Sequence, residues 1–239
     1  MSSTQPIVLL VHGAFAGSDS WDGVVERLLA RSVDVVAVAN PLRSVTGDAE
    51  YVRDVIAAIG RPVVLVGHSY GGIVVTGAAA DNDAVKALVY VAAFAPDTGE
   101  SALQLSQKFP GSTLGETLIG YPLTSGGNEL RIRGDAFPTQ FAADVPTERA
   151  VVMAAEQRPV TELALSEGLP GAEAAWRRVP SWFVYGEEDR NIPAELERFM
   201  AERAGSRSTT GVTGGSHALS VSHPAEVAAT IIEAVEAVA

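Results

Sequence analysis

Short apolar runs alternate with amphipathic segments over most of the chain. Continuous apolar runs are typical of parallel strands covered on both faces, whereas apolar residues three and four positions apart indicate helices. Strands are therefore predicted at residues 7–11, 33–38, 62–66, 85–91, 182–185 and 207–212, and helices at 21–29, 47–59, 71–80, 193–203 and 224–238. This alternation predicts the α/β class, with a mostly parallel, doubly wound sheet of about six strands and right-handed crossovers.

The alternation fails between residues 97 and 178. This stretch is richer in Gly, Pro, Thr and Gln, and its elements are short. Helix-like pieces are predicted at 102–109, 147–157 and 161–167, and a small hairpin at 121–124 and 129–133. We therefore expect a core formed by residues 1–96 and 179–239, interrupted by a mainly helical insertion at 97–178.

The residues Gly67-His68-Ser69-Tyr70-Gly71 lie between a predicted strand and a predicted helix and match the pattern G-x-S-x-G. A serine at such a turn projects its hydroxyl into a cleft, and the flanking glycines keep Cβ atoms out of the crowded turn. The N-terminus of the following helix favours developing negative charge. The alternative is a tight turn with an incidental serine, but the flanking strand and helix favour Ser69 as a nucleophile.

A serine hydroxyl needs a base to become an effective nucleophile, and the chain offers four histidines. His68 adjoins the nucleophile, where successive side chains diverge, and His12 ends the first strand in a His-Gly turn, so both are predicted to be structural. His223 precedes a proline and is predicted to lie at the start of the last helix. His217 lies in the Gly-rich loop after the last strand and is the predicted base, against the alternative of a solvated loop histidine.

A carboxylate is needed to fix the tautomer of the base. The residues Gly186-Glu187-Glu188-Asp189 follow a predicted strand and include three carboxylates. Asp189 is the predicted acid, because it has a short side chain and lies three residues past the glycine. Its place between serine and histidine also gives the chain order Ser, Asp, His, which occurs in triads built on a nucleophile turn. Asp97, after the fourth strand, is the second candidate. Ser69, Asp189 and His217 each follow a predicted strand, where functional residues gather in parallel sheets.

Composition narrows the function classes. The chain has 239 residues, 47% of them apolar, which suits one domain with an insertion and a sizeable core. Its formal net charge of −12 disfavours binding to nucleic acid. The chain has no cysteine and no cluster of His and carboxylates at ligand spacing, so neither a metal nor a cofactor is expected.

Two short stretches bear on location. Residues 1–6 are polar and lack the charged and apolar regions of a secretory signal, so a cytoplasmic location is expected. The uncharged stretch 62–80 is about as long as a membrane span, yet it contains His68, Ser69 and several glycines. A buried strand, turn and helix explains it better, and no membrane partner is expected.

Together these motifs resemble the α/β-hydrolase fold over nearly the full chain. His12-Gly13-Ala14-Phe15 resembles its oxyanion loop, residues 67–71 its nucleophile elbow, 186–189 its acid loop and Ser216-His217 its base loop, in the family's order. The compact form is similar to the plant methylesterase and hydroxynitrile lyase branch and its bacterial esterase relatives. This resemblance implies that the family's first two strands are missing, that residues 97–178 form a cap, and that the backbone amides of Ala14 and Tyr70 form the oxyanion hole.

Two positions depart from the lyases of this branch. Those lyases carry a threonine matching Ala14 and a lysine matching Ala218, and the alanines here favour ester cleavage. Ser69 excludes the aspartate-nucleophile chemistry of dehalogenases and epoxide hydrolases with the same fold. The resemblance therefore implies a carboxylesterase-like serine hydrolase of neutral esters or lactones. Thioesterase, C–C hydrolase, lyase and cofactor-free dioxygenase chemistry stay open, as does a non-catalytic ligand-binding protein on the same fold.

Apolar side chains near the predicted cleft are candidates for substrate contacts. Phe109, Phe137, Phe141 and Met153 lie in the otherwise polar insertion, and Phe15 follows the oxyanion residue, so an apolar roof and wall over Ser69 is predicted. The alternative is that they only pack the insertion onto the sheet. The apolar roof and the negative net charge both favour small to medium, neutral apolar substrates over anionic ones.

Overall fold

Six parallel strands form the main sheet of the computed structural model, which describes residues 5–239. Their order is β2-β1-β3-β4-β8-β9. The strands are β1 (Ile7–Val11), β2 (Val35–Val38), β3 (Val63–Ser69), β4 (Val85–Ala93), β8 (Ser181–Gly186) and β9 (Ser208–Val212). The central strand β3 is buried along its whole length, and for this reason its sequence is a continuous apolar run and not an alternating one.

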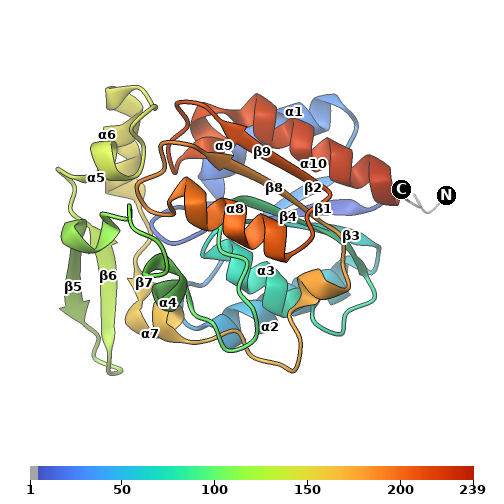
Figure 1. Cartoon of the computed structure of the whole chain (residues 1–239), viewed down its shortest axis with the longest axis horizontal. Helices are drawn as coiled ribbons and strands as arrows, with labels where there is room; N and C mark the ends of the chain where they lie inside the picture. Colours follow the sequence, from blue (N-terminus) through green and yellow to red (C-terminus); the bar gives the residue numbers. More distant parts are fainter. Residues whose placement is uncertain (1–4) are drawn as a thin grey trace.

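Helices cover both faces of this sheet (Figure 1). α1 (Asp22–Ala30) and α10 (Pro224–Val238) pack on one face, and α2 (Val45–Ile59), α3 (Gly71–Ala79) and α8 (Ala194–Arg203) on the other. Successive residues of β1 point to opposite faces. Val8 and Leu10 pack with α1 and α10, whereas Leu9 and Val11 pack with α2 and α3. The predicted doubly wound α/β architecture is confirmed.

Residues 97–178, which we call the cap segment, lie between β4 and β8 in the chain and form their own small antiparallel sheet. Its strands are β5 (Leu118–Pro122), β6 (Asn128–Ile132) and β7 (Val160–Thr161). More of the segment is helical, in α4 (Ala102–Ser106), α5 (Phe137–Gln140), α6 (Thr147–Glu156), α7 (Glu162–Ser166) and the 3-10 turns η2 (Leu114–Thr117) and η3 (Ala175–Arg177). The segment, coloured green to yellow-orange in Figure 1, extends to the end of the molecule opposite the C-terminus.

Several boundaries differ from the sequence-based expectations. The predicted hairpin is present, but β5 begins at Leu118, three residues before the expected strand, and the short strand β7 completes a sheet that the pattern did not indicate. α2 begins at Val45 and not at Gly47, because the Ser44 hydroxyl caps it by accepting the Gly47 amide at 3.0 Å. A short helix α9 (Leu219–Ser222) also precedes α10.

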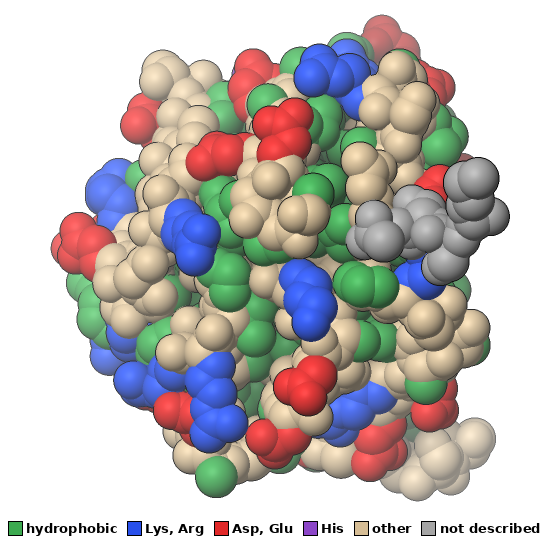
Figure 2. Space-filling view, turned by 90° about the vertical axis from the view of Figure 1, so that its right-hand side faces the viewer, with side chains coloured by type: hydrophobic (Ala, Val, Ile, Leu, Met, Phe, Trp, Pro, Cys, Tyr) green, Lys and Arg blue, Asp and Glu red, His purple; other side chains and the backbone are tan. Residues whose placement is uncertain are grey.

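The surface carries both signs of charge. Lysine, arginine and carboxylate side chains are interspersed with apolar ones on the face at the end where the C-terminus lies (Figure 2). Among residues 5–239, no helix combines the length and hydropathy that crossing a bilayer requires. The expectation of a cytoplasmic location was based on the polar residues 1–6. Most of these, residues 1–4, lie outside the described residues.

Candidate active site

The turn between β3 and α3 holds Ser69 in a strained conformation. Ser69 has φ +54°, in the left-handed region that residues other than glycine rarely adopt. The neighbouring strand and helix are too close for additional atoms. A Cβ on Gly67 would lie 2.6 Å from the Gly71 carbonyl oxygen, and a Cβ on Gly71 would lie 2.4 Å from the Val11 carbonyl oxygen. Both glycines are therefore required by close packing around the serine.

Ser69, His217 and Asp189 form a continuous hydrogen-bonded chain. Ser69 Oγ lies 2.9 Å from His217 Nε2, and His217 Nδ1 lies 2.6 Å from Asp189 Oδ2. The other carboxylate oxygen, Oδ1, accepts the backbone amides of Asn191 at 2.7 Å and Ile192 at 3.0 Å. The three members of the chain are buried. Because Asp189 can only accept, Nδ1 carries the proton of a neutral imidazole and Nε2 faces the serine as an acceptor.

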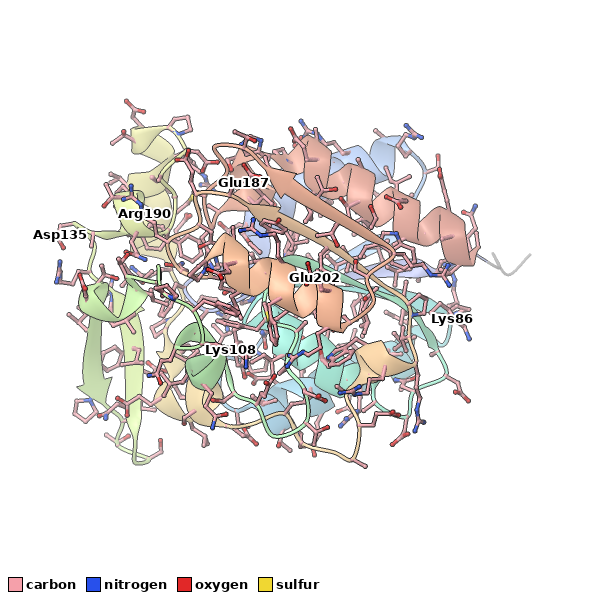
Figure 3. The ribbon with its side chains drawn as sticks, in the orientation of Figure 1. Lys86, Lys108, Asp135, Glu187, Arg190 and Glu202 are labelled. Atoms are coloured by element: carbon pink, nitrogen blue, oxygen red, sulfur yellow. The ribbon has the colours of Figure 1, made fainter. Side chains whose placement is uncertain are left out.

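These residues converge because each follows a different parallel strand. β3 ends at Ser69, Asp189 follows β8, and His217 follows β9. Figure 3 shows the direction of the strands, since Lys86 near the start of β4 lies at one end of the molecule and Glu187 and Arg190 after β8 lie toward the other. The carboxyl ends of parallel strands share one edge, where loops can bring distant residues together.

Two further histidines have structural surroundings. His12 Nε2 accepts the Asn40 amide at 3.1 Å and Nδ1 lies 2.9 Å from the Gly13 carbonyl oxygen, and burial lowers its pKa to about 4. His68 Nε2 lies 2.9 Å from the His217 carbonyl oxygen, and burial together with the neighbouring His217 ring lowers its pKa well below the ordinary value. Both rings are therefore neutral near neutral pH and hold backbone segments together.

Asp144, from the cap segment, holds the loop that carries His217. Its carboxylate accepts the Ser216 amide at 3.1 Å and also the Ser216 hydroxyl. His223 Nε2, at the N-terminal end of α10, lies 3.3 Å from the same carboxylate. The cap segment therefore contacts the loop of His217 directly, a contact that no sequence motif indicated.

The other candidate acids lie away from His217. Asp97 is ion-paired with Arg177 and accepts the Thr98 amide at 2.9 Å. The side chains of Glu187 and Glu188 are exposed. Of the four carboxylates considered from the sequence, the structure brings Asp189 alone into hydrogen-bond contact with the base.

The loop after β1 lies directly against the nucleophile. A Cβ on Gly13 would lie 2.6 Å from the Cβ of Ser69, so the backbone of this loop touches the serine. Ala14, the next residue, and Tyr70, at the start of α3, are both buried. Among residues 5–239, neither of their backbone amides donates to a protein acceptor. The Tyr70 hydroxyl is used elsewhere, since it donates to Asp48 at 2.8 Å.

A cavity of about 110 Å³ adjoins Ser69. Its walls are mainly aliphatic and come from the core and from the cap segment. The lining residues are Ser69, Phe94, Ala102, Leu103, Ser106, Ser112, Leu114, Gly115, Leu118, Leu165, Asn191 and Ile192. A space of this kind accepts a small apolar group next to the serine hydroxyl.

The aromatic roof expected from the sequence is not the lining of this cavity. Phe137 stacks on Phe141 with ring centroids 4.8 Å apart, and Phe141 packs edge-on against the His217 ring at 4.9 Å. Phe15 and Met153 are buried as well, and all four lie outside the cavity lining. These side chains pack the cap segment and the loops onto the core, because large aromatic rings gain most from complete burial.

One buried carboxyl group lies close to the site without joining the hydrogen-bonded chain. Glu197 on α8 has no exposed surface. Burial raises its pKa well above the ordinary value of 4.5, and the negative charge of Asp189 raises it further. Burial therefore favours the protonated form of Glu197. In the sequence, Glu197 lies beside Leu196 and three residues before Met200, which are both on the buried side of α8. This placement is the sequence signal that could have indicated the burial of Glu197.

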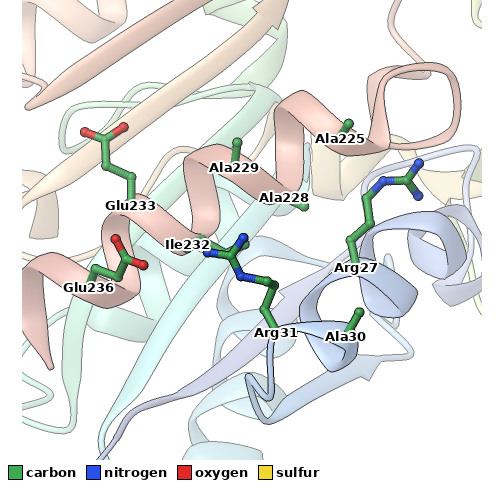
Figure 4. Close-up of a pocket in the computed structure, with 9 residues that line it drawn as sticks. All are labelled: Arg27, Ala30, Arg31, Ala225, Ala228, Ala229, Ile232, Glu233 and Glu236. Atoms are coloured by element: carbon green, nitrogen blue, oxygen red, sulfur yellow. The ribbon is translucent and has the colours of Figure 1, made fainter.

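A larger groove of about 510 Å³ lies elsewhere, between α1 and α10 (Figure 4). It is lined by alanines, one isoleucine and charged residues, and its lining includes no hydroxyl or imidazole side chain. Within the described part of the chain, no three His, Cys, Asp or Glu side chains are placed to hold a metal ion.

The doubly wound sheet and the serine on its sharp strand-to-helix turn define the class of α/β enzymes with a nucleophile elbow. Residues 8–230 match the sequence profile of the alpha/beta hydrolase family. The chain belongs to this family.

The relatives of the chain include esterases. It is 28% identical to Methylesterase 2 of Arabidopsis thaliana over 217 residues, which cover 80% of this chain and 81% of that protein. It is 26% identical to Alpha-hydroxynitrile lyase of Arabidopsis thaliana over 236 residues, which cover 90% and 92%. The crystal structure of polyneuridine aldehyde esterase shares the fold, with a TM-score of 0.82 at 21% identity over 96% of this chain and 98% of that one. These matches confirm the predicted branch and identify an α/β-hydrolase enzyme with esterase relatives.

Proposed function

We propose that this protein is a serine hydrolase that cleaves neutral carboxylic esters or lactones through Ser69, His217 and Asp189. The observation that carries the proposal is the hydrogen-bonded chain, with 2.9 Å from Ser69 Oγ to His217 Nε2 and 2.6 Å from His217 Nδ1 to Asp189 Oδ2. A neutral imidazole held by a carboxylate presents an unprotonated nitrogen to the serine, as a general base must.

In the first half of the proposed reaction, Ser69 Oγ attacks the ester carbonyl carbon while His217 Nε2 takes the hydroxyl proton. Asp189 stabilises the imidazolium that forms. The imidazolium then gives its proton to the departing alkoxide as the C–O bond breaks, which leaves an acyl-enzyme. In the second half, His217 takes a proton from water, the hydroxide adds to the acyl group, and the proton returns to Ser69 as the acid leaves.

The backbone amides of Ala14 and Tyr70 are proposed to hold the oxyanion. Their support is that neither donates to a protein acceptor among residues 5–239, and that the loop before Ala14 touches Ser69 through Gly13. Tyr70 also precedes the first residue of α3, where the positive end of the helix dipole favours negative charge. Donors placed in this way stabilise the charge that develops on the carbonyl oxygen.

The substrate is proposed to be neutral and largely apolar. Leucine side chains dominate the cavity beside Ser69, and burying a charged group among them is unfavourable. The net charge of −12 weakly repels anions as well. In this proposal residues 97–178 act as the cap, since they supply most of the cavity wall.

Labelling with a fluorophosphonate probe tests the proposal, because only an activated serine reacts. The wild-type protein should be labelled, Ser69→Ala should not, and Ser166→Ala, an exposed serine in the cap segment, should behave like wild type. Turnover of a 4-nitrophenyl ester should fall by about 10⁴-fold or more in Ser69→Ala, with nearly unchanged thermal stability. Labelling of Ser69→Ala, or substantial turnover by it, contradicts the proposal. Turnover of thioesters, followed by thiol release, and of cyanohydrins, followed by cyanide release, tests the related chemistries of the fold.

A further inference from the structure

One polar side chain that lines the cavity beside Ser69 is held in place through one of its amide atoms, while its other amide atom has no hydrogen-bond partner among residues 5–239. Asn191 lines this cavity and is 3% exposed. Its Oδ1 accepts a hydrogen bond from Gln140 Nε2 at 2.7 Å, whereas its Nδ2 has no hydrogen-bond partner among residues 5–239. Buried donors are almost always paired in folded proteins, so an unpaired one on a residue that lines a ligand cavity points to a group on the ligand.

The orientation of this amide follows from its neighbours. Gln140 Nε2 also donates to the Arg190 carbonyl oxygen at 2.9 Å, and Gln140 Oε1 accepts from Thr113 Oγ1 at 2.9 Å. A carbonyl oxygen can only accept, so the nitrogen of Gln140 faces Arg190 and its second N–H requires an acceptor on Asn191. The oxygen of Asn191 is therefore committed to Gln140, and its NH₂ group is left for another partner.

The surroundings make this donor selective. The cavity that Asn191 lines is also walled by Ile192 and by the cap-segment leucines Leu103, Leu114, Leu118 and Leu165. A pure hydrocarbon group in this cavity would leave the Asn191 NH₂ group buried and unpaired, whereas a group with one acceptor oxygen would satisfy it. A site built to hydrogen-bond a ligand discriminates strongly against an analogue that lacks the matching atom.

We propose that Asn191 is a specificity-determining residue, and that the substrate group in this cavity is a short apolar chain bearing one hydrogen-bond acceptor, a ketone or ether oxygen. The inference rests on the proposed ester hydrolysis and adds the chemical class of the ester. The cavity of about 110 Å³ is smaller than the cavity of about 150 Å³ that holds a benzene molecule in another protein. The group therefore has roughly four or five non-hydrogen atoms.

A matched pair of esters tests this proposal: the ketone-bearing 4-nitrophenyl 4-oxopentanoate and the plain 4-nitrophenyl pentanoate. The ratio of their two kcat/KM values is compared between proteins, so that the intrinsic reactivity of each ester cancels. Asn191→Leu removes both amide atoms, and Asn191→Asp keeps an acceptor for Gln140 but loses the donor. The ratio should fall at least about tenfold in both variants. Asn128→Leu, the same substitution on β6 outside the cavity, should keep the wild-type ratio.

A ratio that stays at the wild-type value in Asn191→Asp and Asn191→Leu overturns the role of Asn191. If the wild-type protein cleaves neither ester and Ser69 is not labelled by a fluorophosphonate, the proposed function fails, and a binding measurement then decides the inference by itself. In Ser69→Ala, the side-chain NH₂ resonance of Asn191, assigned by its loss in Asn191→Leu, should shift on titration with pentan-2-one and not with pentane. Equal shifts with both ligands, or none, overturn the inference.

Discussion

Replacing Asp189 by asparagine should remove almost all turnover while leaving the fold in place. The new side chain has the same shape, and its oxygen can still accept the amides of Asn191 and Ile192, now 2.7 and 3.0 Å from Oδ1. Because those amides are donors, they select the oxygen and turn the NH₂ group toward His217 Nδ1. The imidazole then carries its own proton on Nε2, and Nε2 no longer accepts the Ser69 hydroxyl proton.

The wrong tautomer reduces the turnover of a Ser-His-Asp enzyme by about 10⁴-fold, which corresponds to about 5 kcal/mol of transition-state stabilisation. The free energy of unfolding should fall by no more than about 3 kcal/mol, because one charge-assisted hydrogen bond is lost and the others are kept. Steady-state hydrolysis of a 4-nitrophenyl ester near neutral pH and a urea unfolding curve measure the two effects separately.

Glu188→Gln is the matched control, since it neutralises an exposed carboxylate on the same loop and should keep most of the activity. If Asp189→Asn retains more than about a tenth of the wild-type kcat/KM, tautomer selection by Asp189 is refuted. If Asp97→Asn is the damaging substitution, the acid lies in the loop after β4.

Three further outcomes are expected. His217→Ala should reduce ester turnover by about 10⁴-fold, and His223→Ala by less than about tenfold; equal losses would show that the base is misassigned. The folded state holds the Glu197 proton more tightly than the unfolded state, so this residue makes the free energy of unfolding fall as pH rises above 4.5. Glu197→Gln should therefore gain melting temperature relative to wild type between that pH and neutrality, and a pH-independent difference contradicts this. Gly71→Ala places a Cβ 2.4 Å from a backbone oxygen and should prevent stable folding, whereas Gly115→Ala, with nothing within 4 Å, should melt like wild type.

The nucleophile turn was predictable from sequence because its constraints are local. Gly67 and Gly71 are needed within a few residues of Ser69, and the buried strand before it shows as an uninterrupted apolar run. His217 and Asp189 lie far from Ser69 in the chain, but a parallel sheet brings the carboxyl ends of its strands to one edge. Strand order in the chain therefore narrowed the candidates to residues that follow strands, Asp97 among them, and the contact with His217 distinguishes Asp189 from the others.

The cavity wall was not predictable in the same way. Phe137 and Phe141 were the conspicuous apolar residues of the insertion, yet they stack on each other and on His217. The wall comes from leucines of four separate short segments, including Leu114 and Leu165, whose meeting depends on how the cap segment folds over the core. The proposed role of Asn191 was not predictable from sequence either, because it depends on which of its two amide atoms is hydrogen-bonded to Gln140.

The hydrogen bonds from Ser216 to Asp144 limit how freely the cap segment of this protein can be replaced by the corresponding segment of another protein. In a modular enzyme, the part that selects the substrate can be replaced while the part that performs the reaction is left alone. Here one carboxylate of the cap segment, the part proposed to select the substrate, holds the backbone next to His217. A graft of a foreign cap onto this core must carry a hydrogen-bond acceptor at the same place, because otherwise a change of selectivity also releases the loop on which the reaction depends.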